Sequence, residues 1–162
     1  MVLGMSLDRF TLLHVVISIV GIVSGFVVAF GLLAGKRLNG LTAIFLLTTL
    51  LTSLTGYGFK FEKLLPAHIV GAISLALLTV AIVSRYVKHM AGGWRAAYVI
   101  SASAALYLNV FVLVVQLFLK VPDLHRLAPT QAEPPFAIAQ GTVLLLFVVL
   151  GIFAVKKFRQ AA

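Results

Sequence analysis

The sequence of 162 residues contains no cysteine. Disulfide bonds, thiolate metal sites, cysteine nucleophiles and covalent attachment of c-type haem are therefore excluded. Charged residues are also scarce, at 10% of the chain, whereas a soluble domain carries about a quarter. Because hydrophobic residues make up 62%, the composition excludes an ordinary water-soluble fold and predicts a membrane protein.

Acidic residues are the scarcest charged type, with 4 Asp and Glu against 13 Lys and Arg and a net charge of +9. The basic residues form no continuous run and no basic helix face interleaved with aromatics, so nucleic acid is excluded as a partner. The charge is instead typical of a chain oriented in a lipid bilayer.

Long apolar stretches dominate the sequence. A helix needs about 20 apolar residues to cross the roughly 30 Å hydrocarbon layer, and five stretches approach that length: 10–34, 41–57, 65–87, 96–119 and 136–155. The second is the shortest, but glycine-containing segments delimit both of its ends. The first is longer than the apolar core of a cleavable signal peptide, which spans about 7 to 15 residues. We expect an all-α fold in which residues 1–162 form a single transmembrane domain, a compact bundle of five transmembrane helices.

The loop charges predict the orientation of this bundle. One set of alternating loops carries eight basic residues and no acid: Lys36, Arg37, Arg85, Lys88, Arg95, Lys156, Lys157 and Arg159. The other set carries every acid with the remaining bases: Asp8, Arg9, Lys60, Glu62, Lys63, Lys120, Asp123, Arg126 and Glu133. Since basic loops face the cytoplasm, the N-terminus is predicted outside and the C-terminus inside.

Polar side chains that could bind a ligand concentrate in the middle and outer parts of the predicted spans. They are His14, Thr52, His68, Asn109, Gln116 and Gln140. Polar groups at membrane depth must face protein or water, so we expect them to line a pocket open to the periplasmic side. The proline-rich loop 120–135, which carries His125, Gln131 and Glu133, is expected to be irregular and to cover this pocket.

Two histidines at similar depth, His14 and His68, lie on helices that both run inward from the outside. This arrangement suits the axial imidazoles of haem b, with Gly21, Gly71 and Ala72 leaving room for the ring. Haem held on both faces by imidazole has no open iron position, so electron transfer is the function expected of it.

A compact Zn, Cu or Fe site is the alternative for the same histidines, with His125, Glu133 or Asp123 completing the ligand shell. A divalent metal with an open position could activate water, so enzymatic activity stays open. Neither histidine lies in a recognised metal-binding motif.

Two non-cofactor functions are also compatible with the sequence. The pocket could belong to a small-ligand transporter, although broken helices and internal repeats are not evident. The chain could instead be a non-catalytic helper subunit that forms a homo-oligomer or docks on a larger membrane complex. The spacing of Gly21 and Gly25 is typical of close helix packing.

Several segments resemble one family. Three of them are Asn109-Val-Phe-Val-Leu-Val-Val-Gln116, Lys120-Val-Pro122 and Leu127-Ala-Pro-Thr-Gln-Ala-Glu-Pro-Pro-Phe136. A fourth is Leu65-Pro-Ala-His-Ile-Val-Gly71, which comes after Thr55-Gly-Tyr-Gly-Phe59. These segments are similar to small uncharacterised (hypothetical) integral inner-membrane proteins of proteobacteria. The resemblance implies location in a bacterial inner membrane.

Overall fold

The computed structural model describes residues 4–59 and 66–159. Helices account for 83% of them, and this part of the chain contains no strand. Five helices are long and apolar enough to cross a membrane. They are α1 (Leu7–Leu33), α2 (Asn39–Gly56), α3 (Pro66–Ile82) with the π-helical turn η1 (Val83–Val87), α4 (Trp94–Lys120) and α6 (Pro134–Lys157). The expected all-α architecture with five membrane-length helices is confirmed. The predicted start of the third span at Leu65 lies outside the described residues.

Local chemistry accounts for several helix ends. The Ser6 hydroxyl accepts a hydrogen bond from the Arg9 backbone N–H at 3.5 Å and caps the start of α1. Gly35 follows α1 with a φ of +70°, a left-handed conformation that glycine adopts without strain. Pro134 and Pro135 occupy the first turn of α6, where the missing proline N–H has no helical acceptor to lose.

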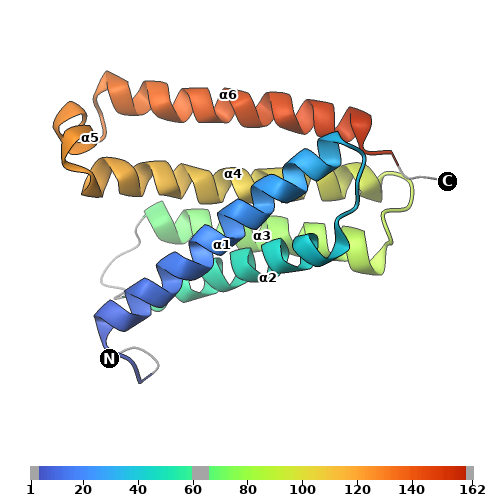
Figure 1. The fold of residues 1–162 in the computed structure, drawn as a ribbon, viewed down its shortest axis with the longest axis horizontal. Coiled ribbons are helices and arrows are strands. Elements are labelled where there is room, and N and C mark those ends of the chain that lie inside the picture. Colours follow the sequence, from blue (N-terminus) through green and yellow to red (C-terminus); the bar gives the residue numbers. More distant parts are fainter. Residues whose placement is uncertain (1–3, 60–65, 160–162) are drawn as a thin grey trace.

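The helices pack as an irregular bundle in which α4 lies between α3 and α6 and α1 crosses obliquely over α2 (Figure 1). A glycine makes this crossing close. A Cβ atom at Gly25 would lie 2.5 Å from Leu106 Cδ1 of α4 and 2.9 Å from the Phe45 ring of α2. Gly21, one turn away, faces Thr48 and Thr49 of α2. Both glycines therefore serve close packing within the chain, as their spacing predicts.

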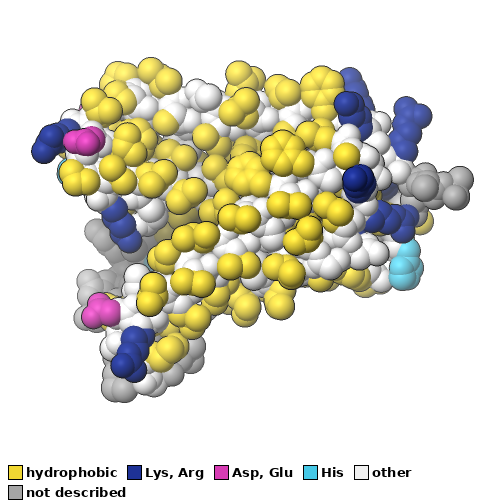
Figure 2. All heavy atoms as spheres, viewed as in Figure 1, with side chains coloured by type: hydrophobic (Ala, Val, Ile, Leu, Met, Phe, Trp, Pro, Cys, Tyr) yellow, Lys and Arg dark blue, Asp and Glu magenta, His cyan; other side chains and the backbone are white. Residues whose placement is uncertain are grey.

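The two ends of the bundle carry different charges. The eight basic residues without an acid gather at one end, here termed the basic end, where α6 ends (Figures 1 and 2). The described acids Asp8, Asp123 and Glu133 belong to the opposite, mixed-charge end, where α1 begins and α5 lies. Lys60, Glu62 and Lys63 fall outside the described residues.

Apolar packing is concentrated toward the basic end. The core includes Val28, Ala29 and Leu32 of α1, Phe45 of α2, Leu78 of α3 and Tyr98 of α4, all at most 3% exposed. Phe158, which follows α6, also belongs to this core. Because α1 crosses obliquely and packs tightly around Gly25, its N-terminal half stays in contact with α2 but diverges from α4 and α6 at the mixed-charge end.

The segment 120–135 is more regular than expected. Its residues Pro122–Leu127 form a short helix, α5, so the prediction of an irregular loop is wrong for this part. The His125 ring Nδ1 lies 3.2 Å from the Phe118 carbonyl oxygen, and Gln131 Nε2 donates to the Val115 carbonyl at 3.0 Å. These bonds fold the segment back against α4.

Candidate functional site: a cavity between α1, α2, α3 and α4

A cavity of about 510 Å³ lies between α1, α2, α3 and α4, on the mixed-charge side of the crossing at Gly25. Its walls are mainly apolar, with Val15, Ile19, Leu108, Val112 and Leu113 among them. This volume is within the range of about 300–1,000 Å³ that is typical of small-molecule and cofactor sites. The cavity lies outside the apolar core cluster, which fills the basic half of the bundle beyond the crossing at Gly25.

Most of the polar residues singled out from the sequence line this one cavity. They are His14, Thr52, His68, Asn109 and Gln116, contributed by four different helices. Gln140 of α6 is not among the lining residues; its Nε2 donates to the Phe111 carbonyl at 3.1 Å. His125 and Glu133 do not line it either, and no residue of 121–135 covers it. The segment expected as a lid therefore lies elsewhere.

The His14 imidazole is held by a polar and an aromatic neighbour. Its Nδ1 lies 2.7 Å from the Thr55 hydroxyl oxygen, and the Phe59 ring meets it edge-on with a centroid distance of 5.3 Å. The Thr55 hydroxyl donates its own proton to the Leu51 carbonyl at 2.7 Å. Thr55 must therefore accept the proton of His14 Nδ1–H, which leaves Nε2 as the ring atom with a lone pair.

The His68 imidazole lies in the first turn of α3 and is only 7% exposed. Its ring packs against Tyr57, with 5.6 Å between centroids, and the Tyr57 hydroxyl donates to the His68 backbone carbonyl at 2.7 Å. A Cβ atom at Gly71 would lie 3.2 Å from the Tyr57 ring. The space that Gly71 leaves, expected to accommodate a haem ring, is thus partly filled by Tyr57.

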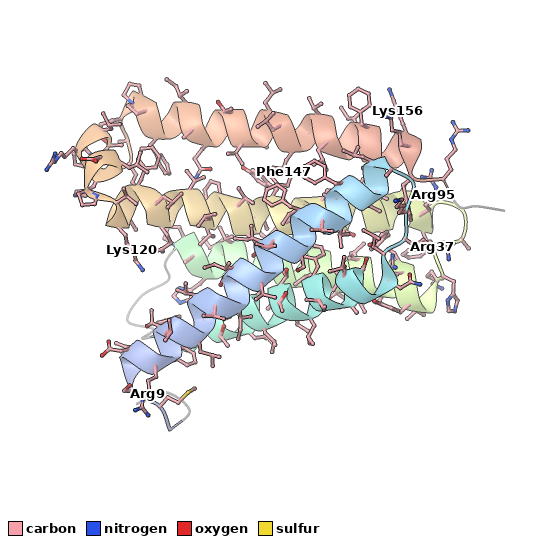
Figure 3. The ribbon with its side chains drawn as sticks, viewed as in Figure 1. Arg9, Arg37, Arg95, Lys120, Phe147 and Lys156 are labelled. Atoms are coloured by element: carbon pink, nitrogen blue, oxygen red, sulfur yellow. The ribbon has the colours of Figure 1, made fainter. Side chains whose placement is uncertain are left out.

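The face of α4 supplies the remaining polar groups. Asn109 Nδ2 donates to the Thr49 hydroxyl at 3.1 Å, so one hydrogen-bonding group of the Asn109 side-chain amide has its partner within the bundle. Gln116 and Lys120 continue this face toward the mixed-charge end, where Figure 3 places Lys120. On α2, Thr52 Oγ1 is buried and has no hydrogen-bond partner among the described residues.

Three contributors were missed from the sequence. Because the apolar stretch ends at Leu119, the sequence predicts Lys120 as a loop charge. The helix α4 in fact continues through Lys120, which lines the cavity. Thr55 belongs to a threonine-rich helix in which no pattern distinguishes the residue that contacts His14. The aromatic character of Tyr57 was visible, but its packing on His68 depends on how α2 and α3 meet.

The lining suits a ligand with an apolar body and hydrogen-bond acceptors or negative charge at one end. The described lining contains two imidazoles, two amides and the Lys120 ammonium, and no carboxylate belongs to it. Among residues 4–59 and 66–159, no group of three or more His, Cys, Asp and Glu side chains lies close enough to hold a metal ion. The described residues therefore assemble a pair of imidazoles rather than a compact three-ligand or four-ligand metal site.

Comparison of the chain with protein-family models, with curated proteins and with solved structures found no significant match. The function of the cavity is therefore inferred from the chemistry of its own lining.

Proposed function

We propose that the chain is a bacterial inner-membrane protein that binds haem b in the cavity and transfers electrons, with His14 and His68 as the axial ligands. The observation that carries this proposal is that imidazoles from two different helices line the same largely apolar cavity. Bis-imidazole ligation occupies both axial positions of the iron and leaves none for a substrate, which is the arrangement of an electron carrier.

The hydrogen bond of His14 supports its role as a ligand. With Nδ1–H directed to Thr55, Nε2 has the lone pair that coordination requires. Ligating histidines commonly donate the proton of their other ring nitrogen to a neighbouring acceptor, which fixes the ring orientation. Among the described residues no Asp, Glu, Cys or further His joins these two in the cavity lining, so haem fits this side-chain set better than a compact Zn, Cu or Fe site.

The apolar walls and the Lys120 ammonium of the described lining support the same ligand. Haem b has a broad apolar face and two anionic propionates, and Lys120 at the mixed-charge end provides a partner for one of them. Under this proposal the mixed-charge end faces the periplasm, with the N-terminus outside and the basic end in the cytoplasm, in agreement with the distribution of Lys and Arg.

Absorption spectroscopy of the purified protein tests the proposal. The full chain, expressed with a supply of haem precursor and isolated in mild detergent, is expected to give a Soret band and sharp bands on reduction. Elemental analysis of the same sample should give one iron per chain. We expect His14→Ala and His68→Ala each to lose the bands, whereas His125→Ala, which lies outside the cavity, retains them.

Two results would overturn the haem proposal. One is a folded, colourless protein that takes up no haem when haem is added. The other is full haem retention by both His14→Ala and His68→Ala.

A second candidate function, transport of a small carboxylate, is favoured by a different observation. Asn109, Gln116 and Lys120 follow one face of α4 along the cavity, and two axial imidazoles would not require all three. Liposomes containing only this protein would be tested for uptake of labelled acetate, lactate and succinate. Uptake that falls in Gln116→Leu but not in the control Gln140→Leu would support transport, and absence of uptake would exclude it for these compounds.

A further inference from the structure

Arg85 is a buried cation at the basic end, far from the haem cavity along the bundle. It lies in the π-helical turn η1 and is only 6% exposed. Its position near the end of an apolar stretch predicts a loop charge facing the cytoplasm, but its side chain lies inside the protein. Burying an arginine costs folding free energy unless an opposite charge balances the guanidinium and acceptors bind its N–H groups.

The contacts of Arg85 compensate it only in part. Its Nη2 donates to the Asn39 side-chain oxygen at 2.7 Å and to the Arg37 backbone carbonyl at 3.0 Å. Its guanidinium carbon lies 5.0 Å from the centroid of the Tyr98 ring and 5.8 Å from that of Tyr86. Its Nη1 is buried and has no hydrogen-bond partner among the described residues.

No carboxylate neutralises this guanidinium in the part of the chain that the structure describes. The single ion pair found there joins Arg126 to Asp123 at the mixed-charge end. Among the described residues of the basic end, every charged side chain is basic. Arg85 therefore has a charge that no described carboxylate compensates and has basic neighbours, and both features favour an anion as its partner.

A second cavity, of about 350 Å³, adjoins Arg85 at the basic end. Its lining consists of Arg37, Asn39, Arg85, Tyr86, His89 and Met90, again without a carboxylate. Arg37 and His89 are exposed, and Figure 3 places Arg37 at this end of the bundle. The cavity thus combines one buried arginine with a more exposed one.

We propose that this second cavity binds a phosphate group, with the buried guanidinium of Arg85 and the more exposed guanidinium of Arg37 as its two cationic contacts. A guanidinium matches the paired oxygens of phosphate, and it forms stronger hydrogen bonds to an anion than to neutral acceptors. Two sources supply this chemistry: the headgroup of an anionic phospholipid and free phosphate. Basic pockets between membrane helices commonly bind lipid headgroups. This site is independent of haem binding.

Calorimetric titration of the full chain in an uncharged detergent tests the proposal. The probes are dihexanoyl phosphatidic acid, inorganic phosphate and, as a phosphate-free control, dihexanoyl glycerol. The variant Arg37→Gln removes the more exposed cation while keeping the backbone carbonyl that Arg85 uses. Arg85→Lys keeps the charge but loses the paired N–H donors. Lys156→Gln is the matched control, a basic residue of the same end that does not line the cavity.

We expect phosphatidic acid to bind and dihexanoyl glycerol not to bind. Arg37→Gln and Arg85→Lys should each weaken binding by about tenfold or more, and Lys156→Gln by less than about threefold. Preference for phosphatidic acid over inorganic phosphate identifies a lipid headgroup site, whereas equal affinity identifies a phosphate site. Absence of binding by either phosphate compound, or equal weakening by Arg37→Gln and Lys156→Gln, would overturn the proposal. If Arg85→Lys does not fold, the comparison of Arg37→Gln with Lys156→Gln decides it.

Discussion

His14 Nδ1 and the Thr55 hydroxyl oxygen lie 2.7 Å apart, joining α1 to α2 at the wall of the larger cavity. The Thr55 hydroxyl in turn donates to the Leu51 carbonyl. This chain of two hydrogen bonds fixes the proton on one nitrogen of the imidazole and fixes the direction in which the other points.

Removing the Thr55 hydroxyl is expected to weaken haem binding. Thr55→Val keeps the shape of the side chain but leaves His14 Nδ1–H without its acceptor, and loss of such a partner typically costs about 10- to 100-fold in metal affinity. The measurement is titration of the haem-free protein with haem b, followed at the Soret band. Thr55→Ser retains the hydroxyl and should bind nearly as well as the parent. Equal affinity of Thr55→Val and the parent would contradict the assigned role of this hydrogen bond.

Adding a methyl group at Gly25 is expected to destabilise the bundle. The new Cβ atom of Gly25→Ala would lie within 3 Å of Leu106 and the Phe45 ring, and overpacking of this kind costs about 1–3 kcal/mol of the free energy of unfolding. Gly141→Ala is the matched control because nothing lies within 4 Å of its added Cβ. Unfolding in detergent, followed by circular dichroism, compares the two. A Gly25→Ala variant as stable as Gly141→Ala would disprove the tight crossing.

Asn109 and Thr49 are expected to be energetically coupled. Asn109 Nδ2 donates to the Thr49 hydroxyl, and Thr49 is fully buried. A double-mutant cycle with Asn109→Leu and Thr49→Val should give a coupling energy of about 0.6 kcal/mol and no more than about 1.7 kcal/mol, the range found for hydrogen bonds between membrane helices. Additive effects of the two substitutions would mean that this hydrogen bond contributes nothing to stability.

Glu133 is expected to make the turn before α6 sensitive to acid. Desolvation raises the pKa of Glu133, but hydrogen bonds from its own backbone N–H and from Thr130 and Ala132 outweigh this effect, so its pKa lies below the ordinary 4.5. The bonds need the carboxylate form. Their contribution is therefore fully present above the ordinary pKa and is lost as the pH falls through the lowered value.

A spin label on Ala132→Cys tests this pH dependence, because the chain has no other cysteine. Label mobility should stay low from about pH 7 to about pH 5 and rise at more acidic pH. Adding Glu133→Gln should make the label mobile throughout. Mobility that is independent of both pH and this substitution would show that the carboxylate does not hold the turn.

The number and approximate bounds of the membrane-length helices follow from the sequence because each is a continuous apolar stretch limited by glycine, proline or charge. Depth along the helices was also informative: five of the polar residues singled out lie around one cavity. Depth alone could not exclude Gln140 from the cavity lining, however. Whether its side chain reaches the cavity depends on the rotation of α6 about its axis and on the side of α4 where α6 packs.

The environment of Arg85 could not be read from the sequence. A positive charge near the end of an apolar stretch normally indicates a residue at the membrane surface. Here the π-helical turn at Val83–Val87 and the approach of Asn39 and Arg37 enclose the side chain. Both depend on packing between segments more than 40 positions apart, which the local sequence does not encode.

The concentration of apolar packing at the basic end has a consequence for local opening. Backbone amides protected by the densest packing exchange their hydrogens only through large-scale unfolding, whereas sparsely packed segments exchange through smaller fluctuations. Within α1, the amides near Val28 and Leu32 should therefore exchange more slowly than those around Val15 and Ile19. A single helix would thus combine a fixed half, which anchors the fold, with a half that opens often enough to admit a bulky ligand to the cavity from the side.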